Sequence, residues 1–143
     1  MKPLSSRALC SVALMALAAC SAKAPRQIAY DVDACEQCHM QVSDPRFGGE
    51  IQTRTGKLYV FDAIECLLDY ERAARAKGDA GSVWVIDFRS PKAFVAADSA
   101  WFVVAPGGRT PMGRGMYATA TQAGAQEIRT SVGGEIKRWS ELQ

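Results

Sequence analysis

The sequence predicts an α+β fold, because short β-rich runs and a longer helical pattern alternate along a chain of ordinary globular composition. The 143 residues are 48% hydrophobic and 22% charged, which supplies enough apolar side chain for a core without disulfides. In the first half the order is strand, strand, helix, strand. A weaker series of similar order follows, but the identity between the halves is too low to establish a duplication by itself.

The predicted elements of the first half are bounded by clear turn signals. Weak alternation over residues 49–54, a Thr-Gly-Lys turn and the apolar run 58–61 predict a β-hairpin. An amphipathic pattern predicts a helix over 63–77, and a second apolar run predicts a strand over 83–88.

The start of this helix has a capping pattern. Asp62 stands three residues before Glu65, as in a capping box. Phe61 is spaced to contact Cys66, as in a hydrophobic staple. We therefore expect Asp62 and Glu65 to cap the helix and Cys66 to lie in the core.

The second half has weaker patterns. Its predicted elements are strands over 93–97 and 101–104, a Gly-Gly turn at 107–108, a helix over 117–129 and a closing segment at Ile136 and Trp139. If the two series are separate units, they divide the chain into halves 35–90 and 91–143.

The first 19 residues have the features of a lipoprotein signal peptide. Lys2 and Arg7 precede an apolar stretch of about a dozen residues, which is shorter than the roughly 20 needed to span a bilayer. The stretch ends in Leu-Ala-Ala followed by Cys20, which resembles the lipobox of bacterial lipoproteins. We therefore expect cleavage before Cys20 and lipidation of its thiol.

A lipidated Cys20 predicts where the protein works. Residues 20–34 lack periodicity and form a lipidated tether, and residues 35–143 form the folded module. The acyl chains would anchor the module to a bacterial membrane, facing the periplasm. Ser21, which follows the cysteine, weakly favours the outer membrane.

The charge distribution argues against a nucleic-acid partner. Without Lys2 and Arg7, the chain has 15 basic and 15 acidic residues, and the basic ones form no run of five or six. A nucleic-acid surface or a polybasic membrane patch would need clustered Lys and Arg.

Soft donors gather in one short segment. Cys35-Glu36-Gln37-Cys38-His39-Met40 holds two thiols, the only histidine and a methionine. The Cys-x-x-Cys-His pattern is that of c-type haem attachment, so a small electron-transfer cytochrome is one interpretation. Others are a structural zinc site with Cys66 as a further donor, a thioredoxin-like disulfide and an ordinary structural disulfide.

A Cu(I) site is the remaining interpretation. Cuprous ion prefers thiolate and thioether donors and tolerates low coordination, so Cys38 and Met40 with one distant methionine would suffice. Met112 lies in the Gly- and Pro-rich loop 110–116, an unusual place for a core residue. No Ser-His-Asp set or phosphate-binding glycine loop points to an enzyme.

These features together resemble one known family, the NosL copper-binding lipoproteins that serve nitrous oxide reductase. The resemblance covers nearly the whole chain after residue 19. It is carried by the lipobox Cys20, Cys38-His39-Met40 where the family commonly has Cys-Gly-Met, Phe61-Asp62 before a helix with Cys66, the strand Trp84-Val85-Ile86-Asp87, and Thr110-Pro111-Met112-Gly113-Arg114-Gly115. The departure is His39 in place of glycine.

The resemblance implies a fold, a ligand set and a partner. It implies a duplicated ββαβ architecture and a Cu(I) ion held by Cys38, Met40 and Met112, with Cys35 and His39 as possible auxiliary donors. It also implies a copper chaperone, not an enzyme, whose partners are nitrous oxide reductase and its membrane assembly factors. The copper would serve assembly of the copper-sulfur centre of that enzyme.

Overall fold

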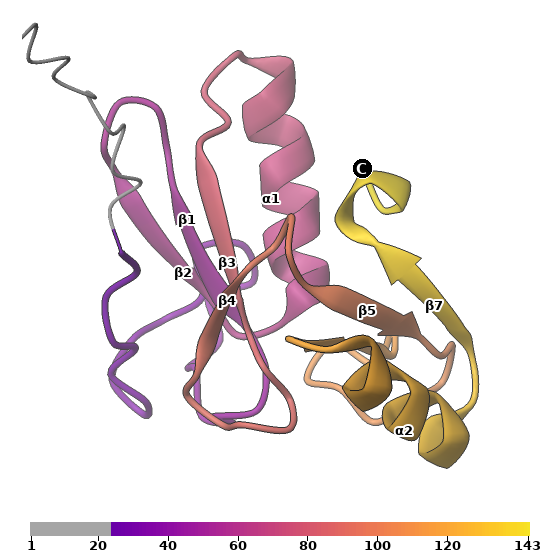
Figure 1. Ribbon diagram of the computed structural model, residues 1–143. Helices are drawn as coiled ribbons and strands as arrows, with labels where there is room; N and C mark the ends of the chain where they lie inside the picture. The colour runs from indigo at the N-terminus through magenta and orange to yellow at the C-terminus, as the bar shows by residue number, and fades with distance from the viewer. Residues whose placement is uncertain (1–23) are drawn as a thin grey trace, which may run out of the picture.

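Two antiparallel sheets form the frame of the protein in the computed structural model, which describes residues 24–143 (Figure 1). The first sheet has the strand order β2-β1-β3-β4 and the second has β6-β5-β7. The strands are β1 (Gly49–Gln52), β2 (Leu58–Phe61), β3 (Ser82–Ile86), β4 (Phe94–Ala96), β5 (Trp101–Val104), β6 (Met116–Thr119) and β7 (Glu135–Arg138). The predicted α+β fold class is confirmed.

The two sheets have the same connectivity. In each, a hairpin is followed by a helix and then by a strand that pairs with the other edge of the first strand, which gives the orders β2-β1-β3 and β6-β5-β7. The helices are α1 (Ile64–Ala76) and α2 (Gln122–Val132). The duplicated ββαβ arrangement is therefore present in the structure, and β4 extends the first copy.

Each helix packs on its own sheet, and α1 also contacts the second unit (Figure 1). Ile64, Leu67 and Leu68 recur at the spacing that places them on one face of α1, and all three are buried. The N-cap residue of α2 is Thr121, whose side chain accepts a hydrogen bond from the Gly124 amide. Capping of this kind satisfies an amide that the helix itself leaves unpaired.

One continuous core joins the two units. It includes Phe61 and Leu67 from the first unit and Phe102 and Met116 from the second, together with Trp139 of the short 3₁₀ helix η1 (Trp139–Glu141). Burying a large apolar side chain stabilises a fold by about 1.5–3 kcal/mol. The shared cluster therefore packs the two units against each other.

Three expectations about local structure are wrong. The predicted helix over 117–129 begins only at Gln122, because residues 116–119 pair with β5 as strand β6. The predicted strand over 93–97 is present as β4, but it pairs with β3 in the first sheet and does not open the second unit. Asp62 does not cap α1, whose N-cap is Ala63 without a side-chain hydrogen bond.

Within residues 24–143, no helix has both the length and the apolar character needed to cross a bilayer. The predicted signal peptide and Cys20 lie outside the described residues.

Candidate metal centre

A tight turn shapes the segment from Cys35 to Met40. Ala34 and Gln41 form an isolated antiparallel bridge, the Cys35 amide donates to the Met40 carbonyl at 2.8 Å, and the His39 amide donates to the Cys35 carbonyl at 2.9 Å. His39 adopts a φ of 61°, a conformation that glycine takes more readily than other residues. This backbone conformation explains why glycine suits the position of His39 in the related motif Cys-Gly-Met, with which Cys38-His39-Met40 was compared above.

The turn separates its side chains between the interior and the surface. Cys35 is fully buried and Cys38 is half-buried, whereas His39 and Met40 are exposed. The segment thus offers one thiol inside the protein, one at its edge and two further donors at the surface.

Four donor atoms meet behind this turn. The sulfurs of Cys35, Cys38 and Cys66 and a carboxylate oxygen of Asp62 all lie within 4.8 Å of one another. All three cysteines of residues 24–143 are free thiols. Sulfur atoms that each bind one metal ion at about 2.3 Å must lie within about twice that distance of one another, which is close to the limit seen in this cluster. The cluster can therefore hold a soft or borderline cation after small adjustments.

Sequence reasoning missed Asp62 as part of this cluster. Asp62 follows β2 directly, and its buried carboxylate accepts a hydrogen bond from the Cys38 sulfur at 3.5 Å. Cys66, which was expected to lie in the core, does pack with Phe61 there, and its sulfur also joins the cluster. The one available signal was the position of Asp62 at a strand–helix junction, four residues before a cysteine.

Burial keeps the inner thiols protonated in the absence of a cation. Desolvation raises the pKa of Cys35 to about 11, although the backbone amides of Cys38, Asp62 and Gln37 favour its thiolate. Desolvation also raises the pKa of Cys66, and the nearby Cys35 and Asp62 raise it further. A bound cation would supply a nearby positive charge that stabilises these thiols in their deprotonated form.

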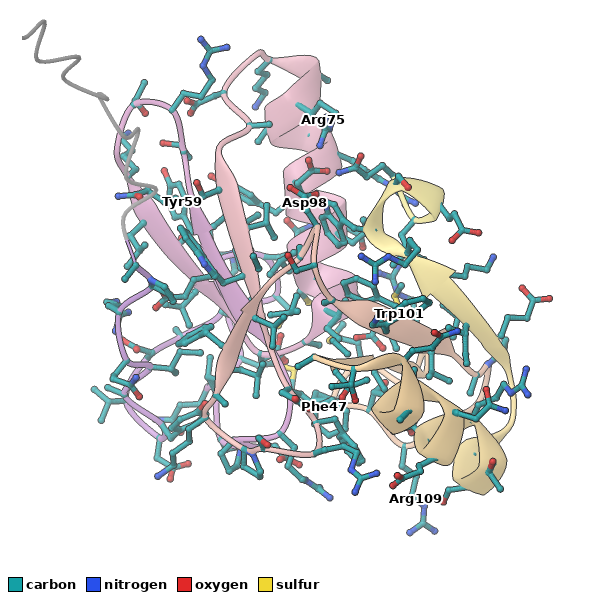
Figure 2. The ribbon with its side chains drawn as sticks, in the orientation of Figure 1. Phe47, Tyr59, Arg75, Asp98, Trp101 and Arg109 are labelled. Carbon is teal, nitrogen blue, oxygen red and sulfur yellow. The ribbon has the colours of Figure 1, made fainter. Side chains whose placement is uncertain are left out.

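A pocket of about 490 Å³ adjoins the cluster. Met40 and Asp62 lie on one side, and Thr110 and Pro111 of the loop between β5 and β6 also line it. Phe47 and Arg109 line the pocket as well. Figure 2 shows Phe47 within the body of the protein and Arg109 extending outward at its edge.

The structure brings the two predicted methionine segments toward one pocket. Met40 lines the pocket with 53% of its surface exposed, and Met112, which is 38% exposed, directly follows the lining residue Pro111. His39 is exposed and is not among the lining residues. Asp62 connects the pocket to the thiol cluster, since it contributes to both.

Known proteins similar to this chain show its family. The NosL family model matches residues 25–143. The chain belongs to the NosL family. The crystal structure of the copper chaperone NosL from Shewanella denitrificans is similar to this chain at 26% identity and a TM-score of 0.68, covering 82% of this chain and 96% of that one. No curated protein matches the chain significantly.

Membership of the NosL family confirms the resemblance seen in the sequence. The alternative of a c-type cytochrome gains no support from the fold or the comparisons. Haem attachment requires a thioether to each cysteine of the motif, whereas the Cys35 side chain is 0% exposed and lies against Cys66 and Asp62. The ligand set Cys38, Met40 and Met112, with Cys35 and His39 as auxiliary donors, stays a prediction.

Proposed function

We propose that this NosL-family protein binds one Cu(I) ion and acts as a copper chaperone, not as an enzyme. The observation that carries the proposal is the half-buried thiol of Cys38, which contacts Asp62 beside the pocket that Met40 lines. Cu(I) prefers sulfur donors, and the site offers thiolate and thioether sulfur together. The similarity to a copper chaperone of known structure supports the same function.

In this proposal Cys38, Met40 and Met112 hold the ion. Cys35 and His39 are auxiliary donors. Cys38 is the most accessible of the three clustered thiols, because Cys35 and Cys66 are buried. The exposed thioethers of Met40 and Met112 leave the site open on the solvent side, so that an incoming ligand can replace one donor at a time. Such stepwise replacement allows fast transfer despite tight binding.

Titration of the purified domain with Cu(I), in competition with a chromogenic cuprous chelator, tests the binding site. We expect an endpoint near one equivalent, and affinity that weakens as the pH falls, because thiolate ligation displaces the Cys38 proton. Protein made in the presence of haem-attachment machinery should show no Soret band. A Soret band, or tight zinc binding that copper cannot displace, would falsify the Cu(I) proposal.

We further propose that the protein is anchored through lipidated Cys20, faces the periplasm and delivers copper for assembly of the copper-sulfur centre of nitrous oxide reductase. The enzyme and its membrane assembly factors are the proposed partners. A membrane anchor would confine the search to two dimensions and raise the effective concentration near any membrane-bound partner. The resemblance of the lipobox and of the Cys38 and Met112 motifs to this family supports the delivery role.

A strain that lacks this protein, or that carries Cys38→Ser together with Met112→Ala, tests delivery. We expect it to export nitrous oxide reductase with reduced copper content and to accumulate nitrous oxide when copper is limiting. The measurement is metal analysis of the purified reductase, with the complemented strain as control. A reductase with full copper under limitation would refute delivery to this enzyme and leave the copper site itself standing.

A further inference from the structure

A buried carboxyl group of α1 holds the loop that carries Met112. Glu65 Oε1 accepts hydrogen bonds from the Thr110 hydroxyl at 2.7 Å and from the Met116 amide at 3.2 Å. The Thr110 hydroxyl oxygen in turn accepts from the Gly115 amide at 3.1 Å. One carboxyl oxygen thus fixes the loop on both sides of Met112.

A second contact fastens the same loop to α1. The Arg114 guanidinium donates to the Glu65 carbonyl at 2.7 Å and forms an ion pair with Asp69 at 3.0 Å. Cys66, the residue after Glu65, contributes its sulfur to the thiol cluster. The first turns of α1 therefore present a thiol to one side and anchor the Met112 loop of the second unit.

Stability alone does not explain why a buried carboxyl group, that of Glu65, holds the loop. Glu65 is 0% exposed, and its Oε2 has no hydrogen-bond partner among residues 24–143. Burying a carboxyl group with one oxygen unpaired is costly, and an apolar residue of similar size would avoid that cost. What the carboxyl provides, and an apolar residue cannot, is a fixed position for the loop.

We propose that Glu65 and Thr110 are positioning residues that hold Met112 beside the pocket lined by Met40 and Asp62, so that the copper site is completed across the two ββαβ units. The inference rests on the proposed Cu(I) function and deepens it. Removing the Thr110 hydroxyl would remove two of the hydrogen bonds that order the loop. Copper binding would then have to order the Met112 thioether, which lowers the affinity.

The matched pair Thr110→Val and Thr110→Ser tests the inference. Valine keeps the shape of threonine without the hydroxyl, whereas serine keeps the hydroxyl. We expect Thr110→Val to raise the dissociation constant for Cu(I) about 10-fold, in the range seen when groups that orient metal ligands are removed, and Thr110→Ser to stay near the original value. Equal affinities for the two variants would overturn the proposal.

A double-variant cycle shows whether Thr110 acts through Met112. In a Met112→Leu background, which has already lost the thioether, Thr110→Val should cause no further loss of Cu(I) affinity. Additive losses would mean that Thr110 affects the site by another route, and the proposal would be overturned. Thermal unfolding of the metal-free variants shows whether each is folded. The Glu65→Leu variant removes the same hydrogen bond from the side of α1 and is a second test of this contact.

Failure of the inference differs from failure of the proposed function. If the unmodified protein does not bind Cu(I), the copper function is wrong and the positioning role falls with it. If the unmodified protein binds Cu(I) tightly and Met112→Leu binds it equally tightly, the copper function survives. The assignment of Met112 as a ligand and the positioning role of Glu65 and Thr110 are then both overturned.

Discussion

The Cys38→Ser variant is expected to lose tight Cu(I) binding, with a dissociation constant raised by about 100-fold or more, which corresponds to about 3 kcal/mol. A serine hydroxyl is a hard, neutral oxygen donor that Cu(I) binds poorly in comparison with thiolate. The side chain is half-buried at the edge of the thiol cluster, so the change removes a donor without opening a large cavity. The variant should therefore remain folded. Chelator competition measures the affinity, and thermal unfolding without metal checks the fold.

The two other thiols are the matched controls for Cys38. Cys35→Ser should weaken Cu(I) binding less, since Cys35 is buried behind the turn. Cys66→Ser should mainly lower stability, because this side chain packs in the core with Phe61 and Leu67. The sulfur of Cys66 nevertheless lies within the cluster. If Cys66→Ser alone removes copper while the fold survives, the three thiols with Asp62 hold the ion and the assignment to Cys38, Met40 and Met112 is wrong.

The second large effect is expected at Glu50, on β1. This side chain is 0% exposed, and its Oε2 accepts a hydrogen bond from the Arg26 amide at 2.9 Å while the Arg26 guanidinium lies 3.7 Å from Oε1. Burial raises the pKa of Glu50 to about 7 from its ordinary 4.5, and the nearby Arg26 offsets only part of this rise.

The raised pKa makes the protein less stable as the pH rises. Well below pH 4.5 the carboxyl is protonated in both the folded and the unfolded chain. The folded state then carries no free-energy penalty for burying a charged carboxylate. Between pH 4.5 and about 7 the unfolded chain loses its proton first, which favours unfolding. The shift corresponds to about 3 kcal/mol of unfolding free energy across this window.

The Glu50→Gln variant should lose this part of the pH dependence. Its amide oxygen can still accept from the Arg26 amide, and it carries no charge to desolvate. Relative to the unmodified protein, its unfolding free energy should therefore rise by up to about 3 kcal/mol between pH 5 and pH 8. Urea unfolding of both proteins at the two pH values measures the difference. Parallel pH profiles would show that Glu50 does not titrate as its burial implies.

Most of the local structure could be predicted from the sequence. Both strands of the first hairpin and helix α1 follow from patterns that a few neighbouring residues encode, such as the period-2 and 3.6-residue spacing of apolar side chains. The soft donors of Cys35 to Met40 and the methionine loop were visible as compositional features. Together these motifs were specific enough to predict the family.

Which distant residues contact one another depends on the packing of the two units and could not be predicted from the sequence. Residues 117–119 precede Thr121, a residue type that favours helix N-caps, but this local signal is weak, and pairing with β5 makes these residues a strand. Asp62 and Glu65 have the spacing of a capping box, but Asp62 contacts Cys38 and Glu65 contacts Thr110, 45 positions away. Local sequence patterns predict hydrogen bonds between neighbouring residues. These two side chains instead form hydrogen bonds with residues distant in the sequence, which the tertiary packing places beside them. The thiol cluster and the pocket beside it form for the same reason, because folding places residues distant in sequence on adjacent surfaces.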